Sequence, residues 1–320
     1  MLKLQNRHLL TGEELSLVEI NALLDLADTL AKERRQGIAQ TNSLQGKHMV
    51  LFFEKPSLRT RLSFTVAMQE LGGFVIDSTS ATRKSEEPED LARVLAGYCH
   101  AVVARVHHHA WVERLASRSP IPVINGLSDS HHPCQVLADI LTLKQRFGSV
   151  EGLRLAYVGD GNNMLHSLLL LMPFLGIQVH YACPQGYEPN ALIRKRAIAR
   201  AKEGVLAKKH SSLFKASESV QAFTDPIEAV RDANVVYTDV WTSMGFETEQ
   251  TDRERAFDGY QLNEEIYSHA APNALIMHCM PMLRGKEISE TLPDHPNSVV
   301  FAQSENRLHA QKALLMGLLG

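Results

Sequence analysis

The sequence has 320 residues, 44% hydrophobic content and a formal net charge of -3. This length and apolar content are enough for a full hydrophobic core, and two compact domains are the expected arrangement. The slight negative charge and the lack of a long basic block give no electrostatic basis for binding nucleic acid or an anionic membrane. Any anion site must therefore be local, and no run of about 18 apolar residues is present for a membrane span.

The cysteines indicate a reducing compartment. Cys99, Cys134, Cys183 and Cys279 are far apart and show no paired spacing. This pattern fits reduced thiols in a cytosolic protein better than a disulfide framework. The N-terminal residues have neither the apolar core of a signal peptide nor the composition of a transit peptide, so we expect a cytoplasmic protein.

The chain begins with a predicted amphipathic helix. Thr11 and Glu14 have the spacing of a capping box, and apolar residues then recur with helical periodicity from Leu15 until Gly37. We therefore expect a helix that starts close to Thr11.

The next feature is the segment 54–64, which joins a predicted strand to a predicted helix. Ser57 falls where that helix begins, and the free N–H groups and positive dipole end of a helix start favour an anion. Arg59, Thr60 and Arg61 add donors, and guanidinium groups bind phosphate oxygens in pairs. The pattern alone leaves two interpretations open, a phosphate site or a serine-capped helix with two surface arginines.

The remaining segments alternate between strands and helices, which predicts parallel sheets with crossover connections. In the first half, strands are expected at 74–76, 101–104 and 122–124, with a helix at 89–98 and a connecting helix at 134–147. In the second half, strands are expected at 155–158, 178–181, 220–223, 234–237 and 274–277. The predicted fold class is α/β, with two doubly wound parallel-sheet domains at 1–148 and 149–303 and a C-terminal helix at 304–320 that returns to the first domain.

Two motifs suggest cofactors, and neither is complete. Residues 159–161 read Gly-Asp-Gly after a strand, but Met164 stands where a dinucleotide fingerprint needs its third glycine, and no acidic residue ends the next strand. Histidines cluster at 107–109 and 131–132 near Cys134, without the paired spacing of a zinc site. We therefore expect no cofactor and no metal.

Several polar residues stand where ligands commonly bind. Asn163 begins the helix after the 155–158 strand, where parallel sheets of this type bind ligands. His132 and Gln135 flank a predicted helix start and could face one small ligand, although a histidine beside proline is often structural. Asp239 follows another strand and could hold a substrate ammonium or simply begin an acidic loop. Cys279 could be a nucleophile, but no general base stands at a recognisable spacing, and buried structural thiols are commoner.

Taken together, these motifs are similar to the ornithine carbamoyltransferase family, a branch of the aspartate/ornithine carbamoyltransferase superfamily, along essentially the whole chain. The matching segments, in the family's order, are 57–61, Arg105, 132–135, 159–163, 239–245, 278–281, 284–285 and 305–307. Ser243, Met244 and Gly245 resemble the family's ornithine-binding loop and not the aspartate-binding loop of its sister.

The resemblance implies transfer of a carbamoyl group from carbamoyl phosphate to ornithine, giving citrulline and phosphate, as a step of arginine metabolism. It places Ser57, Leu58, Arg59, Thr60, Arg105, His132, Gln135, Cys279, Met280 and Arg307 around carbamoyl phosphate. It places Asn163, Asp239, Ser243 and Met244 around ornithine. Among these, Cys279, Arg105, His132 and Asp239 are the expected catalytic residues.

The resemblance also implies a homotrimer, or a multiple of trimers, with sites at subunit borders. Residues 80–84 depart from the family, because many members have there a glutamine that reaches a neighbouring site; Arg83 or Lys84 could substitute. Leu58 and Met280 replace the commoner threonine and leucine, where mainly the backbone contributes. The alternatives are a sister enzyme acting on N-acetylornithine, putrescine or aspartate, and a non-catalytic relative that binds an anion.

Overall fold

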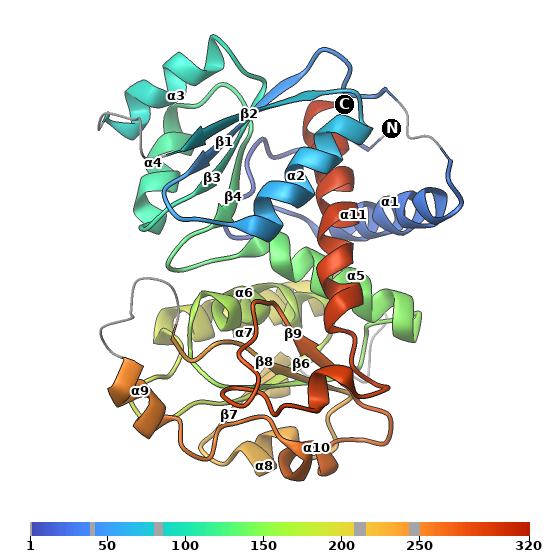
Figure 1. The fold of residues 1–320 in the computed structure, drawn as a ribbon, viewed down its shortest axis with the longest axis vertical. Coiled ribbons are helices and arrows are strands. Elements are labelled where there is room, and N and C mark those ends of the chain that lie inside the picture. Colours follow the sequence, from blue (N-terminus) through green and yellow to red (C-terminus); the bar gives the residue numbers. More distant parts are fainter. Residues whose placement is uncertain (1, 39–41, 80–85, 208–215, 243–249) are drawn as a thin grey trace. The chain divides into compact units, whose positions relative to one another are not determined.

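The computed structural model describes residues 2–38, 42–79, 86–207, 216–242 and 250–320 (Figure 1). The chain divides into two compact units, and helices α5 and α11 contain the divisions. Unit 1 comprises Met1–Leu141 and Glu305–Gly320, and unit 2 comprises Thr142–Ser304. Within the described stretches, no helix has the length and apolar character needed to cross a membrane.

Unit 1 is built on a parallel sheet with the strand order β2-β1-β3-β4. Its strands are β1 (His48–Phe53), β2 (Phe74–Thr79), β3 (Ala101–Arg105) and β4 (Val123–Leu127). Its helices are α1 (Leu17–Arg35), α2 (Leu58–Glu70), α3 (Pro88–Ala96), α4 (His109–Arg118) and the unit 1 parts of α5 (Pro133–Phe147) and α11 (Val300–Leu319). The strands predicted from apolar runs are confirmed.

Helices cover both faces of the unit 1 sheet (Figure 1). On one face, Leu91 of α3 and Leu115 of α4 pack with Val50 and Val102 of the strands. On the other, α2 buries Phe64 completely. Because a strand covered on both faces has no polar side, its sequence reads as a continuous apolar run.

The predicted start of the first helix is wrong. The capping box that begins α1 is formed by Ser16 and Glu19, after a non-helical segment. The Glu14 carboxylate does accept hydrogen bonds from the N–H groups of Thr11 and Gly12, at 3.0 and 2.7 Å. Gly12, however, has a φ of +97°, which is incompatible with a right-handed helix and directs the chain into a turn.

Unit 2 contains a parallel sheet with the strand order β7-β6-β5-β8-β9. Its strands are β5 (Arg154–Val158), β6 (Gln178–Ala182), β7 (Val220–Phe223), β8 (Val235–Thr238) and β9 (Leu275–His278), all of which were predicted. Its helices include α6 (Asn163–Leu171), α7 (Ala191–Ala207), α8 (Pro226–Val230), α9 (Gln250–Ala256) and α10 (Glu264–Ser268). The strand order reverses at β5 and β8, and such a reversal opens a crevice at the carboxyl ends of the two strands.

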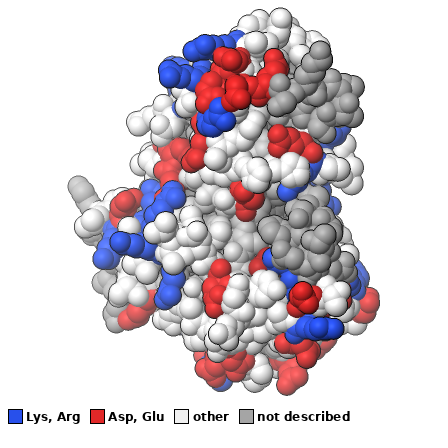
Figure 2. Space-filling view, turned by 90° about the vertical axis from the view of Figure 1, so that its left-hand side faces the viewer, with Lys and Arg blue, Asp and Glu red and all other residues white. Residues whose placement is uncertain are grey.

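The surface charge agrees with the small net charge. On the face shown in Figure 2, basic groups lie next to acidic ones. An anion site must therefore be formed by a few converging side chains and not by a broad basic surface.

Candidate active site

Helix α2 begins as the sequence predicts, but Ser57 does not act as an ordinary cap. Ser57 is the N-cap residue with φ of -156° and ψ of 110°, and its side chain makes no capping hydrogen bond. Arg61 is not available for an anion as first expected, because its guanidinium forms an ion pair with Asp77 and lies 5.6 Å from the centroid of the Phe53 ring. Ser57 and Arg59 are two other donor-bearing side chains that the sequence assigns to the phosphate at this helix start.

A second arginine reaches the same helix start from the other end of the chain. Arg307 of α11 donates a hydrogen bond of 2.6 Å to the hydroxyl of Thr60, in the first turn of α2. Both side chains are buried, with Thr60 fully enclosed. The α2–α11 contact therefore fixes a guanidinium beside the predicted phosphate site.

His132 is the buried imidazole of this region. Only 4% of its surface is exposed. Burial and then the neighbouring guanidiniums of Arg307, Arg105 and Arg59 hold the pKa of His132 well below its ordinary value. A buried histidine beside three positive charges stays neutral at pH 7, so it can donate one hydrogen bond without adding charge.

Gln135 has an unused acceptor in this region. Its Nε2 donates to the Asp139 carboxylate at 2.9 Å, which fixes the orientation of the amide. Its Oε1 is buried and has no hydrogen-bond partner among the described residues. Because a buried acceptor without a partner is costly, this oxygen is prepared for an N–H donor from a ligand.

In unit 2, Asp239 is the centre of a hydrogen-bond cluster at the crevice end of β8. Its carboxylate accepts from the Cys279 thiol at 2.9 Å and from Nδ2 of Asn162 at 2.8 Å. Asn162 also caps α6, so it ties Asp239 to the start of that helix. Asn163, which the sequence singles out, is the next residue and is also buried, but Asn162 makes the contact.

The turn between β5 and α6 is glycine-rich for packing reasons. A Cβ added to Gly161 would lie 2.3 Å from the backbone nitrogen of Pro189. The Gly161 N–H donates to the Tyr187 carbonyl at 2.8 Å, and the carboxylate of Asp160 forms a buried ion pair of 2.9 Å with Arg253. The contacts of this turn within the chain thus account for the partial dinucleotide motif.

Sequence reasoning gave His278 no role within the 278–281 motif and missed Glu287; these two residues hold the loop that carries Cys279. His278 Nδ1 accepts from the Met280 N–H at 2.9 Å, so Nε2 carries the hydrogen and donates to the Glu287 carboxylate at 3.1 Å. The same carboxylate oxygen accepts from the Leu283 N–H at 2.5 Å. Both ends of the loop are therefore tied to one buried side chain. No motif in the sequence signals Glu287.

Met280, in the middle of this loop, has an unusual backbone. Its φ is +61°, in the left-handed region that non-glycine residues rarely adopt. Such a conformation persists where surrounding contacts determine it, and outliers of this kind concentrate at functional sites.

One grouping in the described part of the chain has the geometry of a metal site. The ligand atoms of Asp239, His278 and Cys279 lie within 4.8 Å of one another. Both ring nitrogens of the histidine and the thiol hydrogen are, however, used in the bonds above. A metal would have to displace these bonds. The histidines at 107–109 and 131–132, considered for zinc, contribute to no such grouping among the described residues.

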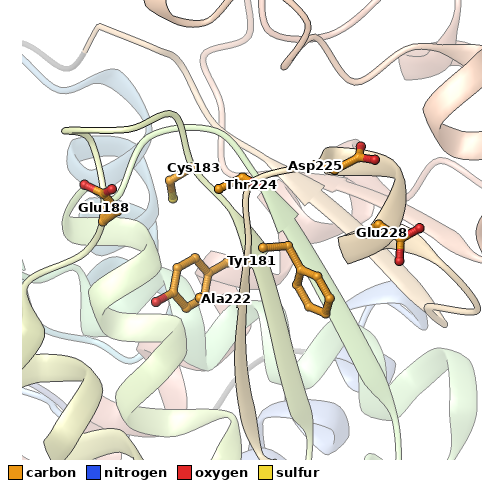
Figure 3. Close-up of a pocket in the computed structure, with 8 residues that line it drawn as sticks. Tyr181, Cys183, Glu188, Ala222, Thr224, Asp225 and Glu228 are labelled. Carbon is orange, nitrogen blue, oxygen red and sulfur yellow. The ribbon is translucent and has the colours of Figure 1, made fainter.

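A recess of about 450 Å³ lies elsewhere in unit 2, at the carboxyl ends of β6 and β7 (Figure 3). It is lined by Tyr181, Cys183, Glu188, Ala222, Phe223, Thr224, Asp225 and Glu228. None of the predicted site residues is among them. Its three carboxylates suit neither phosphate nor the carboxylate end of an amino acid, so this recess is not the predicted site.

The predicted residues divide between the two units. Ser57, Leu58, Arg59, Thr60, Arg105, His132, Gln135 and Arg307 belong to unit 1, and Asn163, Asp239, Cys279 and Met280 belong to unit 2. Leu58 has a side chain that is 66% exposed, in agreement with a contribution from its backbone. Ser243, Met244, Arg83 and Lys84 lie outside the described residues.

Family models divide the chain at nearly the same place, except that the second model also covers Arg307 and continues to residue 318. Residues 7–145 match the family model described as the carbamoyl-P binding domain of aspartate/ornithine carbamoyltransferase, and residues 151–318 match the model of its Asp/Orn binding domain. The ornithine carbamoyltransferase of Parafrankia sp. is 46% identical over 318 residues, which cover 98% of this chain and 96% of that protein. The anabolic ornithine carbamoyltransferase of Pyrococcus furiosus is 42% identical over 323 residues, which cover 100% of this chain and 98% of that protein.

Solved structures agree as well. The ornithine carbamoyltransferase structure from Pyrococcus furiosus has a TM-score of 0.92 and 42% identity, covering 100% of this chain and 99% of that chain. The structure from Thermus thermophilus has a TM-score of 0.86 and 40% identity, covering 98% and 99%. The fold and the family expected from the sequence are thus confirmed, and the chain belongs to the aspartate/ornithine carbamoyltransferase family.

Proposed function

We propose that this protein transfers the carbamoyl group of carbamoyl phosphate to the δ-amine of L-ornithine, giving L-citrulline and phosphate. One observation carries the proposal: Arg307 of α11 donates to the Thr60 hydroxyl in the first turn of α2, where Arg59 also lies, and the charges of Arg307, Arg105 and Arg59 act with burial to lower the pKa of His132. Such a concentration of positive charge around a hydrogen-bond donor suits a small, highly charged anion. It also suits a reaction in which negative charge grows on a carbonyl oxygen and then on a leaving phosphate.

In this proposal, unit 1 holds carbamoyl phosphate. Ser57, Arg59 and the backbone N–H groups at the start of α2, including that of Leu58, bind phosphate oxygens. Thr60, Arg105, His132 and Arg307 stabilise the carbonyl oxygen and the departing phosphate. The Oε1 of Gln135, which has no hydrogen-bond partner among the described residues, accepts from the carbamoyl NH2 group. Family resemblance assigns backbone carbonyls near Cys279 and Met280, in unit 2, to the same group.

The amine belongs to unit 2. Asp239 binds either the α-ammonium or the δ-amine of ornithine, and the Cys279 thiol beside it helps to orient the nucleophile. Asn163, Ser243 and Met244 are assigned to the rest of the substrate by family resemblance. The amine attacks as the neutral form, and the leaving phosphate can take its proton. No cofactor takes part in these steps.

The choice of ornithine rests on the Ser243-Met244-Gly245 sequence and on the names of the relatives at 41 to 46% identity. We propose a place in arginine biosynthesis, since one of these relatives is named anabolic. The test is a citrulline colour assay on purified protein, extended to the carbamoylation of N-acetylornithine, putrescine and aspartate with carbamoyl phosphate in excess. Ornithine should give the highest kcat/KM. A higher value for another amine would assign the chain to a sister activity, and no product with any amine would favour a non-catalytic relative.

We further propose domain roles and an assembly. Residues 1–148, together with the helix at 304–320 that packs back on them, form the carbamoyl-phosphate domain. Residues 149–303 form the ornithine domain. The protein belongs to the cytoplasm. A homotrimer or a multiple of trimers is carried over from the family resemblance. Association of some kind is supported by apolar residues left exposed on the edge strand β2 and on α2, namely Phe74, Ile76, Leu58 and Leu62. Light scattering should give a trimer or a multiple, and an active monomer would contradict shared sites.

A further inference from the structure

The turn that leads into His132 is closed by its own hydrogen bonds. The N–H of Ser128 donates to the carbonyl of His131 at 3.0 Å, and the N–H of His131 donates to the Ser128 hydroxyl at 3.2 Å. Nδ2 of Asn125 donates to the same hydroxyl at 3.3 Å. The Ser128 hydroxyl is therefore the centre of the turn that immediately precedes the imidazole proposed to bind substrate.

His109, on α4, completes this arrangement. Its Nδ1 lies 2.9 Å from the Ser128 hydroxyl oxygen. A hydroxyl has one hydrogen to donate and two lone pairs to accept with. The N–H groups of His131 and Asn125 lie within reach of the two lone pairs. The hydroxyl hydrogen has two acceptors within reach, His109 Nδ1 at 2.9 Å and the His131 carbonyl at 3.4 Å, and the shorter contact is to His109. A hydrogen bond from the hydroxyl to His109 Nδ1 requires a neutral histidine with its own hydrogen on Nε2.

Protonation of His109 is incompatible with the complete network. An imidazolium carries a hydrogen on Nδ1 as well, which makes it a third donor to a hydroxyl that has only two lone pairs. One of the three donors must be lost, and the hydroxyl hydrogen must turn from His109 to the His131 carbonyl, 3.4 Å away. Asn125 can give up the hydroxyl, because its Nδ2 also lies 2.8 Å from the Leu10 carbonyl and 3.2 Å from the His131 carbonyl. Proton uptake at His109 would thus rearrange the hydrogen bonds of the turn that places His132.

The surroundings of His109 are mixed in charge. His109 is 9% exposed, its ring packs edge-on against the His131 ring with 4.7 Å between centroids, and Glu113 lies 3.7 Å from its Nε2. Asp129 accepts from the His109 N–H at 2.9 Å. Burial lowers the pKa of His109, while the carboxylates of Glu113, Asp129 and Glu14 act to raise it. Burial is the largest of these effects, so the pKa of His109 is lowered and the neutral form is favoured.

We propose that His109 is a positioning residue for His132: in its neutral form it completes the Ser128 network that fixes the 128–131 turn, and its protonation weakens use of carbamoyl phosphate. The inference rests on the proposed function, because His132 acts there on carbamoyl phosphate. His109 itself touches no reacting atom.

The test compares kcat/KM for carbamoyl phosphate, at saturating ornithine, between the wild type and His109→Gln. Glutamine can accept from the Ser128 hydroxyl but does not titrate. The ionisations of both substrates and of His132 are common to the two proteins, so they cancel in the ratio. We expect the ratio of variant to wild type to rise by at least about twofold between about pH 7.5 and about pH 5, in the range where histidine titrates.

The matched control is His108→Gln. His108 also lies near Asp129, with Nδ1 3.4 Å from its carboxylate, but its side chain is exposed and has no contact with Ser128. Its ratio to wild type should stay flat with pH. A flat ratio for His109→Gln in an active enzyme, or an equal rise for both variants, would overturn the inference. A wild type without activity would instead contradict the proposed function.

A second variant keeps the inference testable if His109→Gln does not fold, as judged by circular dichroism at each pH. Ser128→Ala removes the centre of the network. We expect it to raise the KM for carbamoyl phosphate by about tenfold, the effect of losing roughly 1.4 kcal/mol, and to leave the KM for ornithine unchanged. Ser128→Ala should also remove the fall of kcat/KM for carbamoyl phosphate in acid. A variant with only a structural defect would keep that fall. An unchanged acid sensitivity would contradict the role of His109.

Discussion

The two polar clusters of this protein are prepared for ligands in opposite ways. The cluster around His132 in unit 1 gathers like charges, with three arginines beside one imidazole, and leaves the Gln135 Oε1 without a partner in the described residues. The cluster around Asp239 in unit 2 is internally satisfied, since Cys279 and Asn162 both donate to its carboxylate. The first therefore suits a small anion, whereas the second must exchange bonds when an amine arrives.

This difference has an energetic meaning. Like charges held together in the free protein destabilise it, and an anion that binds among them relieves that repulsion. A satisfied carboxylate gives no such gain, so its selectivity depends on how well a substrate amine replaces the donors already present. We expect carbamoyl phosphate to bind the free protein by itself. The identity of the amine should depend on unit 2.

The largest effect is expected from Arg59→Ala, which tests the unit 1 half of the comparison. It removes a charge-assisted phosphate contact worth about 1.5 to 3 kcal/mol before any transition-state charge is counted. We expect kcat/KM for carbamoyl phosphate to fall by about a hundredfold to a thousandfold. The control is Arg61→Ala, two residues further along α2, because the Arg61 guanidinium is paired with Asp77 and should matter little. Near-normal activity of Arg59→Ala would exclude the phosphate assignment.

Asp239→Asn tests the unit 2 half. Loss of the charge that meets an ammonium should lower kcat/KM for ornithine by about one to three powers of ten, since each 1.36 kcal/mol of lost transition-state binding is a factor of ten. Steady-state kinetics with ornithine as the varied substrate measures this. Asp225→Asn is the matched control, because Asp225 also follows a strand of the sheet but lies in the separate recess. Equal losses in both variants would contradict the assignment.

Glu287→Gln tests whether the hydrogen-bonded cluster around Asp239 depends on the contacts that hold the Cys279 loop. One oxygen of the Glu287 carboxylate holds both His278 and the Leu283 N–H, and an amide oxygen can accept both bonds but lacks the negative charge that strengthens them. We expect kcat to fall by about tenfold. Glu264→Gln is the control, because this exposed carboxylate accepts from Ser289 and from Thr291 but does not hold the 278–283 loop. Similar kinetics for both variants would mean that the Glu287 contacts are not needed for catalysis.

The smallest effect concerns the free energy of unfolding in acid. It depends on buried neutral histidines, and each unit has at least one. Burial and Arg154 lower the pKa of His180 in unit 2 to about 4. An unfolded chain takes up a proton on this histidine as the pH falls through about 6.5, before the folded protein does. The free energy of unfolding should therefore decrease from about pH 6.5 down to about pH 4. His180→Gln should show a smaller fall in thermal midpoint over this range, and an unchanged fall would contradict the prediction.

Much of the fold could be predicted because parallel strands buried on both faces read as apolar runs. The strand at 49–53 and the end of the helix before Gly148 are examples of local signals. The start of α1 could not be predicted, because two capping patterns stand in tandem and only the positive φ of Gly12 decides between them. A backbone conformation of this kind is set by the surrounding structure as well as by the glycine.

The site was predictable only in part for a similar reason. The helix start at Ser57 has a local pattern, so it could be found from the residues alone. The contact between Thr60 and Arg307 joins residues that are 247 positions apart, and only the family resemblance pointed to it. The pairing of Arg61 with Asp77 and of Glu287 with His278 depends on how elements pack, and these contacts leave no signature in the spacing of the sequence.

The most direct test of the comparison is calorimetric titration of carbamoyl phosphate into the wild type, Arg59→Ala and Asp239→Asn, with no amine present. The account predicts binding by the wild type, binding of similar affinity by Asp239→Asn, and an affinity at least about tenfold weaker for Arg59→Ala. Equal affinity of Arg59→Ala and wild type, or loss of binding in Asp239→Asn alone, would contradict a carbamoyl-phosphate site that is prepared in unit 1 independently of Asp239.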